Sequence, residues 1–400
     1  MNLINVAKIA IYGIFINYYC YYILQGSFIP YGTILFYALA FMCVILDAYK
    51  SNRMSRKTEI MYWIFYGVVS LALVSFAQSS SHVFSGLYKY AQRTALIVFI
   101  YYICSKESSI RFAINLLMTT AVSCAISILM TIDNITSRLS LSTGADVSAN
   151  DVGAILAFGC FAILQVNLEK IRSSTIRNLL KVSGIILCIT VIFLTGSRKS
   201  IYAVILLWLL LFIMGVNDYW KNISPATFFS LTAVLILASV WISDNLVPYM
   251  YETSLYNRLF GVDVDITVAS DDGRMELYAL ALKDFWKKPI IGMGFNNFDF
   301  LHGTYSHSTY VEPLANSGLL GLLYLIPYVE IVKKQIRLVR AYRYSSQNKL
   351  QQKEILSFLI VFLFIGIGIP YIYKDYACII LAMFLANQTI AFRENRYNGE

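Results

Sequence analysis

The sequence predicts an all-α integral membrane protein of about 12 transmembrane helices, because apolar runs long enough to cross a bilayer follow one another along the chain. Of its 400 residues, 58% are apolar and only 14% are charged, and the mean hydropathy is +0.62. Soluble domains carry about a quarter charged residues. The stretch Asp244–Gly318 is the one long polar segment. We therefore expect a single polytopic membrane domain over residues 1–400, with residues 244–308 outside the bilayer as a loop.

The predicted spans follow from the length that a bilayer core about 30 Å thick requires of a helix. The first apolar run, from about Ile9 to Leu24, has no cleavage site of small residues behind it, so we expect it to be the first span. The seventh and eighth spans are short and joined by a tight turn. The predicted ranges are 6–24, 29–47, 60–77, 89–104, 111–131, 151–167, 183–196, 200–216, 226–243, 309–332, 355–372 and 376–392.

Basic residues in short connections predict the orientation of these spans. Short loops rich in lysine and arginine stay in the cytoplasm. Both termini are then cytoplasmic, and the odd-numbered connections, with all three histidines, face outward. The same distribution explains the net charge of +9 without nucleic acid as a partner. The basic residues crowd the second, sixth and tenth connections: Lys50, Arg53, Arg56 and Lys57; Lys170, Arg172, Arg177 and Lys181; Lys333, Lys334, Arg337, Arg340, Arg343, Lys349 and Lys353.

Neither a metal nor a cofactor is expected from the sequence. The seven cysteines lie inside apolar runs without CxxC or Cys/His ligand spacing, which argues against disulfides and structural zinc. An acidic cluster includes a DxD pair, but it lacks the central glycine and the terminal glutamate of an EF-hand loop. We interpret it as a solvated acidic loop, with a metal site as the alternative. The cluster is Asp263, Asp265, Asp271 and Asp272.

Arg198 and Lys199 lie in the outward turn Thr195-Gly-Ser-Arg-Lys-Ser200, between the seventh and eighth spans. A cation at a membrane boundary snorkels, pairs or binds a ligand. One interpretation is an interfacial pair without a ligand. The other is a clamp on a lipid-linked phosphate, because a guanidinium group presents a planar fork of donors that matches phosphate oxygens. A positive-inside chain has little topological reason to keep these cations outside, which favours the clamp.

Arg274 opens a helical pattern over residues 274–286, which we predict to be an amphipathic helix along the outer surface. In the first turn of a helix a positive charge opposes the helix dipole. This placement indicates an external partner for the guanidinium group. A salt bridge to Asp271, Asp272 or Glu276 is the alternative.

His307 lies at the outer end of the tenth predicted span, with Glu312 a little over one turn deeper. An imidazole can deprotonate a sugar hydroxyl near neutral pH, and a carboxylate can orient the imidazole. An interfacial histidine that only makes hydrogen bonds is the alternative. His302 and His82 have no comparable context, and we interpret them as loop residues.

Taken together, these three places resemble the O-antigen polymerase and ligase superfamily of bacterial envelope enzymes. Their order, their outward placement and the span count also agree with it. The close match covers residues 196–200 and roughly 262–321, and the rest of the chain matches only as a membrane layout. The matching residues are Gly196-Ser-Arg-Lys-Ser200, Gly273 to Phe285, Pro289-Ile-Ile-Gly-Met-Gly-Phe-Asn-Asn-Phe298, Ser306-His-Ser-Thr-Tyr310 and Asn316-Ser-Gly-Leu-Leu-Gly321.

The resemblance implies a GT-C-like, metal-independent glycosyltransferase of the bacterial plasma (inner) membrane, with its active site facing outward. Its donor would be an oligosaccharide linked to undecaprenyl diphosphate; the lipid bilayer and a chain-length regulator are further partners to consider. Carried over by position, Arg198 and Arg274 would hold the donor diphosphate, and His307 would act at the acceptor hydroxyl. The other residues expected to contact substrate are Lys199, Glu312, Tyr305 and Tyr310.

We consider four functions for this pattern. The segment Gly292-Met-Gly-Phe-Asn-Asn-Phe298, the His307-Ser-Thr-Tyr310 start and the 30 tyrosines favour a polymerase of O-antigen or capsular polysaccharide. An O-antigen ligase, which moves the polysaccharide to a lipid A-core acceptor in lipopolysaccharide biosynthesis, shares these positions. A lipid-linked oligosaccharide flippase would place its charges inside the bundle and keep short outer loops, the reverse of this pattern. A scaffold subunit of an assembly complex is the fourth.

Overall fold

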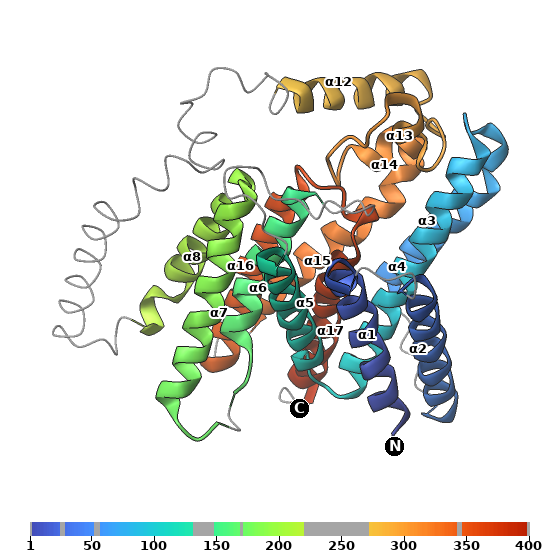
Figure 1. The fold of residues 1–400 in the computed structure, drawn as a ribbon. Helices are drawn as coiled ribbons and strands as arrows, with labels where there is room; N and C mark the ends of the chain where they lie inside the picture. Colours follow the sequence, from blue (N-terminus) through green and yellow to red (C-terminus); the bar gives the residue numbers. More distant parts are fainter. Residues whose placement is uncertain are drawn as a thin grey trace.

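The computed structural model describes residues 2–24, 29–51, 57–130, 148–168, 171–219, 272–341 and 346–397, and all regular elements in these ranges are helical (Figure 1). The segment α12–α14 lies at one end of the bundle, which we call the upper end, whereas both chain termini lie at the opposite, lower end (Figure 1). The α-helices are α1 (Leu3–Leu24), α2 (Ile29–Ser51), α3 (Thr58–Ala72), α4 (Ser80–Lys106), α5 (Arg111–Met130), α6 (Ala149–Gln165), α7 (Ser174–Thr195), α8 (Arg198–Tyr219), α12 (Asp272–Lys287), α13 (Asn297–His302), α14 (Glu312–Ser317), α15 (Leu322–Ala341), α16 (Ser346–Gly366) and α17 (Asp375–Tyr397), with 3-10 turns η1 (Val74–Phe76), η3 (Gly318–Gly321) and η4 (Tyr371–Tyr373).

Within the described residues, 6 helices are long and apolar enough to cross a membrane. Three shorter apolar helices join them, Leu3–Asn17, Thr58–Ala72 and Ala149–Gln165. This supports an integral membrane protein. The ninth predicted span, 226–243, and most of the acidic cluster lie outside the described residues. The six long segments are Gly32–Ser51, Arg111–Met130, Ser174–Thr195, Arg198–Gly215, Glu312–Ala341 and Asp375–Glu394.

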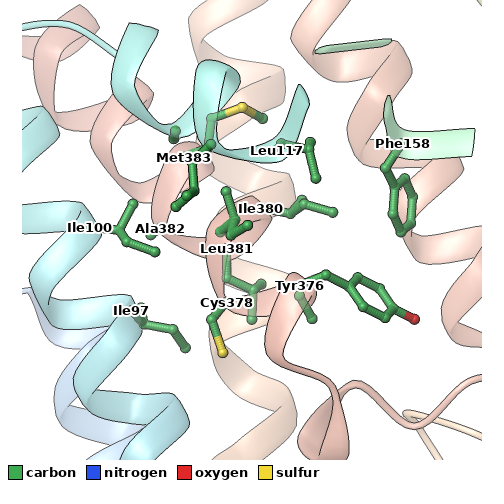
Figure 2. Packing of buried hydrophobic residues seen from close by; sticks show 14 of the residues in the cluster. Ile97, Ile100, Leu117, Phe158, Tyr376, Cys378, Ile380, Leu381, Ala382 and Met383 are labelled. Carbon is green, nitrogen blue, oxygen red and sulfur yellow. The ribbon is translucent and has the colours of Figure 1, made fainter. Parts of the chain in front are cut away.

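Helix α17 forms the centre of the bundle. Its apolar window is 83% buried, whereas the corresponding windows of α7 and α8 are 22% and 28% buried and lie at the periphery. Figure 2 shows its residues Tyr376 to Met383 packed against Ile97 and Ile100 of α4, Leu117 of α5 and Phe158 of α6. The connection that precedes α17 is therefore anchored at the middle of the upper end.

Among the predicted spans whose limits differ in the structure, two are broken at or next to glycines. The eleventh, predicted as 355–372, ends at Gly366, because Gly366, Gly368 and Pro370 follow one another where the helix would have continued. The tenth, predicted as 309–332, is divided by Gly318, whose φ of +58° lies outside the helical region. Each break lets the backbone leave the bundle axis at the upper end, and the functional residues described below gather at these two breaks.

Helices α4 and α7 begin earlier than the apolar runs predict. Residues Ser80 to His82, expected in a connection, form the first turn of α4, with Ser79 at its N-cap. Ser173 caps α7, and its hydroxyl accepts a hydrogen bond from the backbone N–H of Ile176 at 3.3 Å. At α4 the Ser79 side chain makes no such cap, but its hydroxyl lies 3.0 Å from His82 Nδ1. Hydrogen bonds of these kinds stabilise a polar first turn without an apolar sequence, which is why hydropathy alone placed these starts too late.

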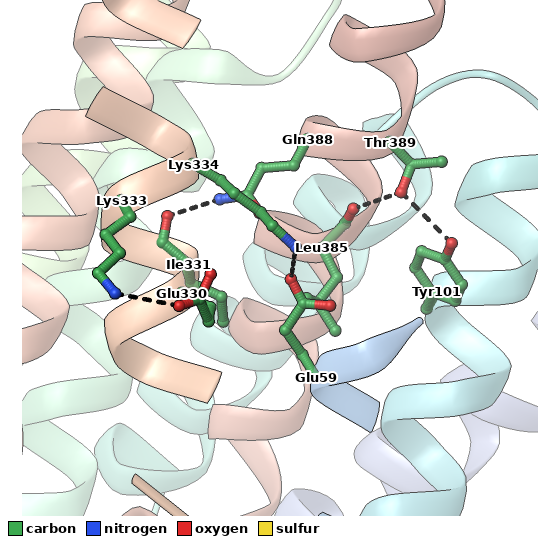
Figure 3. A network of polar contacts seen from close by, with 9 residues as sticks. All are labelled: Glu59, Tyr101, Glu330, Ile331, Lys333, Lys334, Leu385, Gln388 and Thr389. Atoms are coloured by element: carbon green, nitrogen blue, oxygen red, sulfur yellow. Dashed lines mark hydrogen bonds and ion pairs between the residues drawn. The ribbon is translucent and has the colours of Figure 1, made fainter. Parts of the chain in front are cut away.

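Polar side chains join α3, α15 and α17 toward the lower end (Figure 3). Lys334 pairs with Glu59, whose side chain is 1% exposed. The Gln388 side-chain amide donates to the carbonyl of Ile331 at 2.7 Å. Lys334, one of the residues of the orientation signal, is therefore also held inside the fold by an ion pair.

Candidate functional site

Helix α12 (Asp272–Lys287) confirms the helix predicted over residues 274–286. It packs against α14, with Ala281 fully buried between them. The Tyr278 hydroxyl donates to the carbonyl of Ile367 at 2.6 Å. Arg274, in the first turn, is half-buried, and among the described side chains it forms no ion pair with Glu276. These contacts fix α12, and the guanidinium group with it, over the connection between α16 and α17.

The glycine-rich turn and the Asn316-Ser-Gly318 segment pack directly on one another. The N–H of Gly294 donates to the carbonyl of Asn316 at 2.8 Å, and the N–H of Leu319 donates to the carbonyl of Pro289 at 2.7 Å. A Cβ at Gly292, where φ is +67°, would overlap the Asn316–Ser317 backbone. Two segments that are separate in the sequence, the glycine-rich turn and Asn316-Ser-Gly318, thus form one folded unit next to α14.

The Glu312 carboxylate is hydrogen-bonded within the protein. Its side chain is fully buried, and it accepts hydrogen bonds from the backbone N–H of Ser306 at 2.6 Å, from the Asn316 amide at 3.0 Å and from the Tyr373 hydroxyl at 2.9 Å. Its oxygens are occupied by groups of the protein, so the structure does not present it to a substrate. Glu312 holds the backbone next to His307 and, through Tyr373, ties it to the η4 turn.

His307 sits in a backbone conformation that few side chains adopt. Its φ is +59°, and it is one of three non-glycine residues with positive φ in the described part of the chain. Such outliers cost free energy and cluster at functional sites. The imidazole lies against the Tyr305 ring, with centroids 4.5 Å apart. The histidine is thus held by its neighbours in a strained but defined position.

Positive charges from separate helices converge on the His307 imidazole. Burial, the largest cause, and the charges of Arg274, Lys374 and Lys199 together lower the pKa of His307 from 6.5 to about 4, while Asp151 acts in the opposite direction. The imidazole is therefore neutral at physiological pH and able to accept a proton. The same cations form an electropositive site that suits an anionic ligand.

Lys199 and Arg198 begin α8 at the upper end. Both are half-buried. A Cβ at Gly368 would overlap the ammonium group of Lys199, so this lysine reaches the connection after α16. The Ser197 hydroxyl before them donates to the Asn150 side chain of α6 at 3.3 Å. Arg198 adjoins Lys199, whose charge acts on His307, and belongs to the same end of the bundle as Arg274.

The segment 366–371, which follows α16, holds the backbone after His307 by hydrogen bonds. The N–H of Thr309 donates to the carbonyl of Gly366 at 2.9 Å, and the N–H of Tyr371 donates to the Thr309 hydroxyl at 2.9 Å. The hydroxyl of Tyr310 donates to the carbonyl of Leu363 at 2.7 Å, which commits it to α16, while its ring is half-buried. Tyr305, also half-buried, lies between His307 and Lys374.

Asp151 and Lys374 form a buried ion pair that the sequence patterns did not single out. Lys374 Nζ lies 2.9 Å from Asp151 Oδ2. Asp151 also belongs to the cap of α6, where the Ser148 hydroxyl accepts a hydrogen bond from the Asp151 N–H at 3.3 Å and the Asp151 carboxylate accepts one from the Ser148 N–H at 3.2 Å. The signal available in the sequence was a lysine and an aspartate, Lys374-Asp375, in the connection between two predicted apolar spans.

The other two histidines are structural. His302 ends α13 and pairs with the buried carboxylate of Asp284 at 2.6 Å. His82 lies in the first turn of α4, where its Nδ1 is 3.0 Å from the Ser79 hydroxyl and its ring contacts Phe300. We had interpreted both as loop residues, but the structure places His82 in α4 and His302 in α13. Most of the tyrosines in the helix interfaces are also structural, because Tyr66, Tyr90, Tyr324, Tyr328, Tyr371 and Tyr376 are buried against other rings and have no face left for a sugar.

Comparison with known proteins finds that one segment of the chain is similar to a protein family. Residues 183–326 match the family described as O-antigen ligase, Wzy_C. The matched segment contains Arg198, Lys199, Arg274, His307 and Glu312, whereas Asp151 and Lys374 lie outside it. None of the curated proteins matches the chain.

Proposed function

We propose, from the similarity of residues 183–326 to the O-antigen ligase family, that this chain is a polysaccharide polymerase. It joins oligosaccharide repeat units carried on undecaprenyl diphosphate at the outer face of the bacterial plasma membrane. The observation that carries this proposal is the convergence of Arg274 and Lys199, from different helices, on the neutral imidazole of His307. A site with several cations and one neutral base suits an anionic leaving group and a hydroxyl nucleophile.

The donor half of the site is cationic. Arg198, Arg274 and Lys199 neutralise the diphosphate as it leaves, which stabilises charge that develops in the transition state without a metal ion. Arginine suits this task because its planar fork donates two hydrogen bonds to phosphate oxygens. The polyprenyl chain of the donor extends into the bilayer between the helices.

The acceptor half of the site is His307. The imidazole takes the proton of an acceptor hydroxyl as that oxygen forms a bond to the anomeric carbon of the donor sugar. The bond from the anomeric carbon to the diphosphate breaks, and undecaprenyl diphosphate leaves with the electron pair. One such displacement extends the glycan by one repeat unit and inverts the anomeric configuration. The leaving diphosphate needs no acid, so the carboxylate pair of glycosidases is not required.

A ligase is the second candidate, because the matched family is described as O-antigen ligase. Donor chemistry would be the same, and only the acceptor would differ, a lipid A-core in place of a second lipid-linked repeat. The acceptor therefore separates the two functions. Purified protein given only lipid-linked repeat units makes longer chains if it is a polymerase and none if it is a ligase.

The proposal is tested in cells that lack the native gene. Arg198→Ala, Arg274→Ala and His307→Gln should each reach the membrane and fail to restore long surface polysaccharide. His82→Gln and Arg111→Ala are matched controls, because His82 lies at the same end without facing His307, and Arg111 is an exposed residue at the start of α5. If all three site variants build normal chains, the assignment is wrong. Translocation of lipid-linked oligosaccharide into vesicles without polymerisation would favour a flippase instead.

A further inference from the structure

The Asp151–Lys374 ion pair is the most deeply buried charged pair at the upper end among the described residues. The exposed fractions of the two side chains are 7% for Lys374 and 4% for Asp151. A buried ion pair is expensive to desolvate, and replacing one by apolar side chains is often neutral or stabilising. Stability alone therefore does not explain why two charges are placed here. Neither residue belongs to the family-matched segment.

The pair connects three elements to His307. Asp151 is held by the capping box at the start of α6, where it already accepts from the Ser148 backbone. Lys374, just before α17, lies with its ammonium group 5.1 Å from the centre of the Tyr305 ring. The opposite neighbour of that ring is the imidazole of His307, at 4.5 Å. The chain of contacts runs from carboxylate to ammonium, to phenol ring, to imidazole.

We propose that Asp151 and Lys374 are positioning residues for His307: the pair holds Tyr305 against the imidazole, and the Lys374 ammonium group, fixed by Asp151, favours the uncharged imidazole, the form that accepts a proton from the acceptor hydroxyl. This inference rests on the proposed function for its purpose, but its physical content is independent of it. The two members of the pair act on the protonation of His307 in opposite directions, because Lys374 is a cation and Asp151 is an anion, and both charges act on the imidazole.

The groups that face His307 come from every element around it. Arg274 of α12, Lys199 of α8 and Lys374 before α17 disfavour its protonated form, and Asp151 of α6 favours it. Tyr305 contributes its ring, and Glu312 is occupied by Ser306, Asn316 and Tyr373. Removing Lys374 leaves Arg274 and Lys199 in place. The imidazole should therefore become easier to protonate, but its pKa should stay below the ordinary value of 6.5.

The experiment measures the titration of His307 directly, by NMR of histidine-labelled full-length protein in nanodiscs. The chain has three histidines, so His82→Gln and His302→Gln assign the signals. Lys374→Met should raise the pKa of His307 from about 4 toward 6.5, and Asp151→Asn should lower it. Lys374 stays protonated at that pH even without its partner, because buried lysines titrate near pH 5–6 at the lowest. Lys374→Arg should leave the titration close to that of the wild type.

Opposite shifts support the proposal, because a merely structural pair would disturb the histidine in the same direction when either member is removed. Lys334→Met is the matched control: it breaks a buried lysine–carboxylate pair at the lower end and should not move the His307 titration. Unchanged titration in both Lys374→Met and Asp151→Asn, or shifts of one sign, overturns the proposal. If Lys374→Met does not fold, the sign of the shift in Asp151→Asn and its absence in Lys374→Arg decide the question.

The outcome is separable from that of the proposed function. Opposite shifts together with full activity of His307→Gln would leave the positioning pair in place and remove the catalytic role of the histidine. Loss of activity in His307→Gln together with an unmoved titration in the pair variants would support the catalytic role of the histidine and overturn the positioning pair. In the expected case, the acidic limb of the pH–activity profile moves with the titration in each variant.

Discussion

Gly318 provides the sharpest test of how the site is assembled, because Gly303 is a comparison position that also has a positive φ and has no neighbours. The angles φ and ψ are +58° and −142° at Gly318, and +70° and 7° at Gly303. An alanine at Gly303 meets the left-handed penalty of about 1–2 kcal/mol, and an alanine at Gly318 meets a backbone penalty at least as large, because almost no residue except glycine adopts its combination of φ and ψ. The stiffer unfolded chain offsets about 0.4–1 kcal/mol in both variants, and this contribution cancels in the comparison.

Contacts add a second difference between the two glycines. A Cβ at Gly318 would lie 2.5 Å from the carbonyl oxygen of Pro289 and 2.7 Å from that of Ile290, whereas ordinary contact begins at 3.4 Å, and a Cβ at Gly303 would meet nothing within 4 Å. Overpacking costs about 1–3 kcal/mol, and loss of the Leu319 to Pro289 hydrogen bond adds about 0.5–1.5 kcal/mol. We therefore expect Gly318→Ala to be about 2–4 kcal/mol less stable than Gly303→Ala.

The assay is equilibrium unfolding of purified protein in mixed micelles, followed by circular dichroism, with polysaccharide formation in cells as the second readout. A difference of this size is more than a tenfold change in the folding equilibrium. Gly303→Ala should retain activity, and Gly318→Ala should lose it even where it inserts normally. Equal stabilities for the two variants would refute the interpretation that the turn and the segment before α15 lock together through their backbones.

Three further predictions concern charged groups. Arg274→Lys should be nearly as inactive as Arg274→Ala in a polymerisation assay, because an ammonium group does not replace a bidentate fork; wild-type rates in Arg274→Lys would contradict the clamp. Wild-type activity should be flat from neutral pH down to about pH 5 and fall below it, because burial and nearby cations lower the pKa of His307 to about 4, and a midpoint near 6.5 would count against this environment. Burial raises the pKa of Asp284, but hydrogen bonds from His302 and Lys287 outweigh it, so the folded pKa is below the ordinary value. Asp284 therefore stabilises the fold above the unfolded pKa, and the stability is lost as the pH falls through the folded pKa; Asp284→Asn should cost about 1–3 kcal/mol at pH 7 and nothing measurable at low pH, and a cost that does not change with pH would refute it.

The sequence predicted the parts of the fold that depend on apolar length. Helices α5, α6 and α8 fall where the apolar runs place them, and α12 falls where helical periodicity places it. Helix starts with polar caps, such as that of α4, were placed too late. The end of α16 was placed too far along the chain, because isoleucines between Gly366 and Pro370 continue the apolar run although the backbone has left the helix.

The sequence could indicate Arg274 and His307 as candidates, because a cation in the first turn of a helix and a histidine at the end of an apolar span are unusual placements. Arg274 and His307 lie at the same end and are close enough for the charge of one to act on the other. The role of Glu312 was not predictable, because spacing places it near His307 but does not say which groups occupy its oxygens. The Asp151–Lys374 pair joins residues 223 positions apart, and only the packing of α6 against the end of α16 and the start of α17 brings them together.

The central claim is that Arg198, Arg274 and His307 act together in glycosyl transfer at the upper end of the bundle. The most direct measurement is the length distribution of glycan made by purified protein in nanodiscs from a lipid-linked repeat unit, without added metal. We expect the wild type to produce a ladder of chains and each of Arg274→Ala and His307→Gln to slow chain growth by about 100-fold or more, with Arg198→Ala similar. Ladders within a few fold of the wild type from folded His307→Gln and Arg274→Ala proteins would contradict the claim.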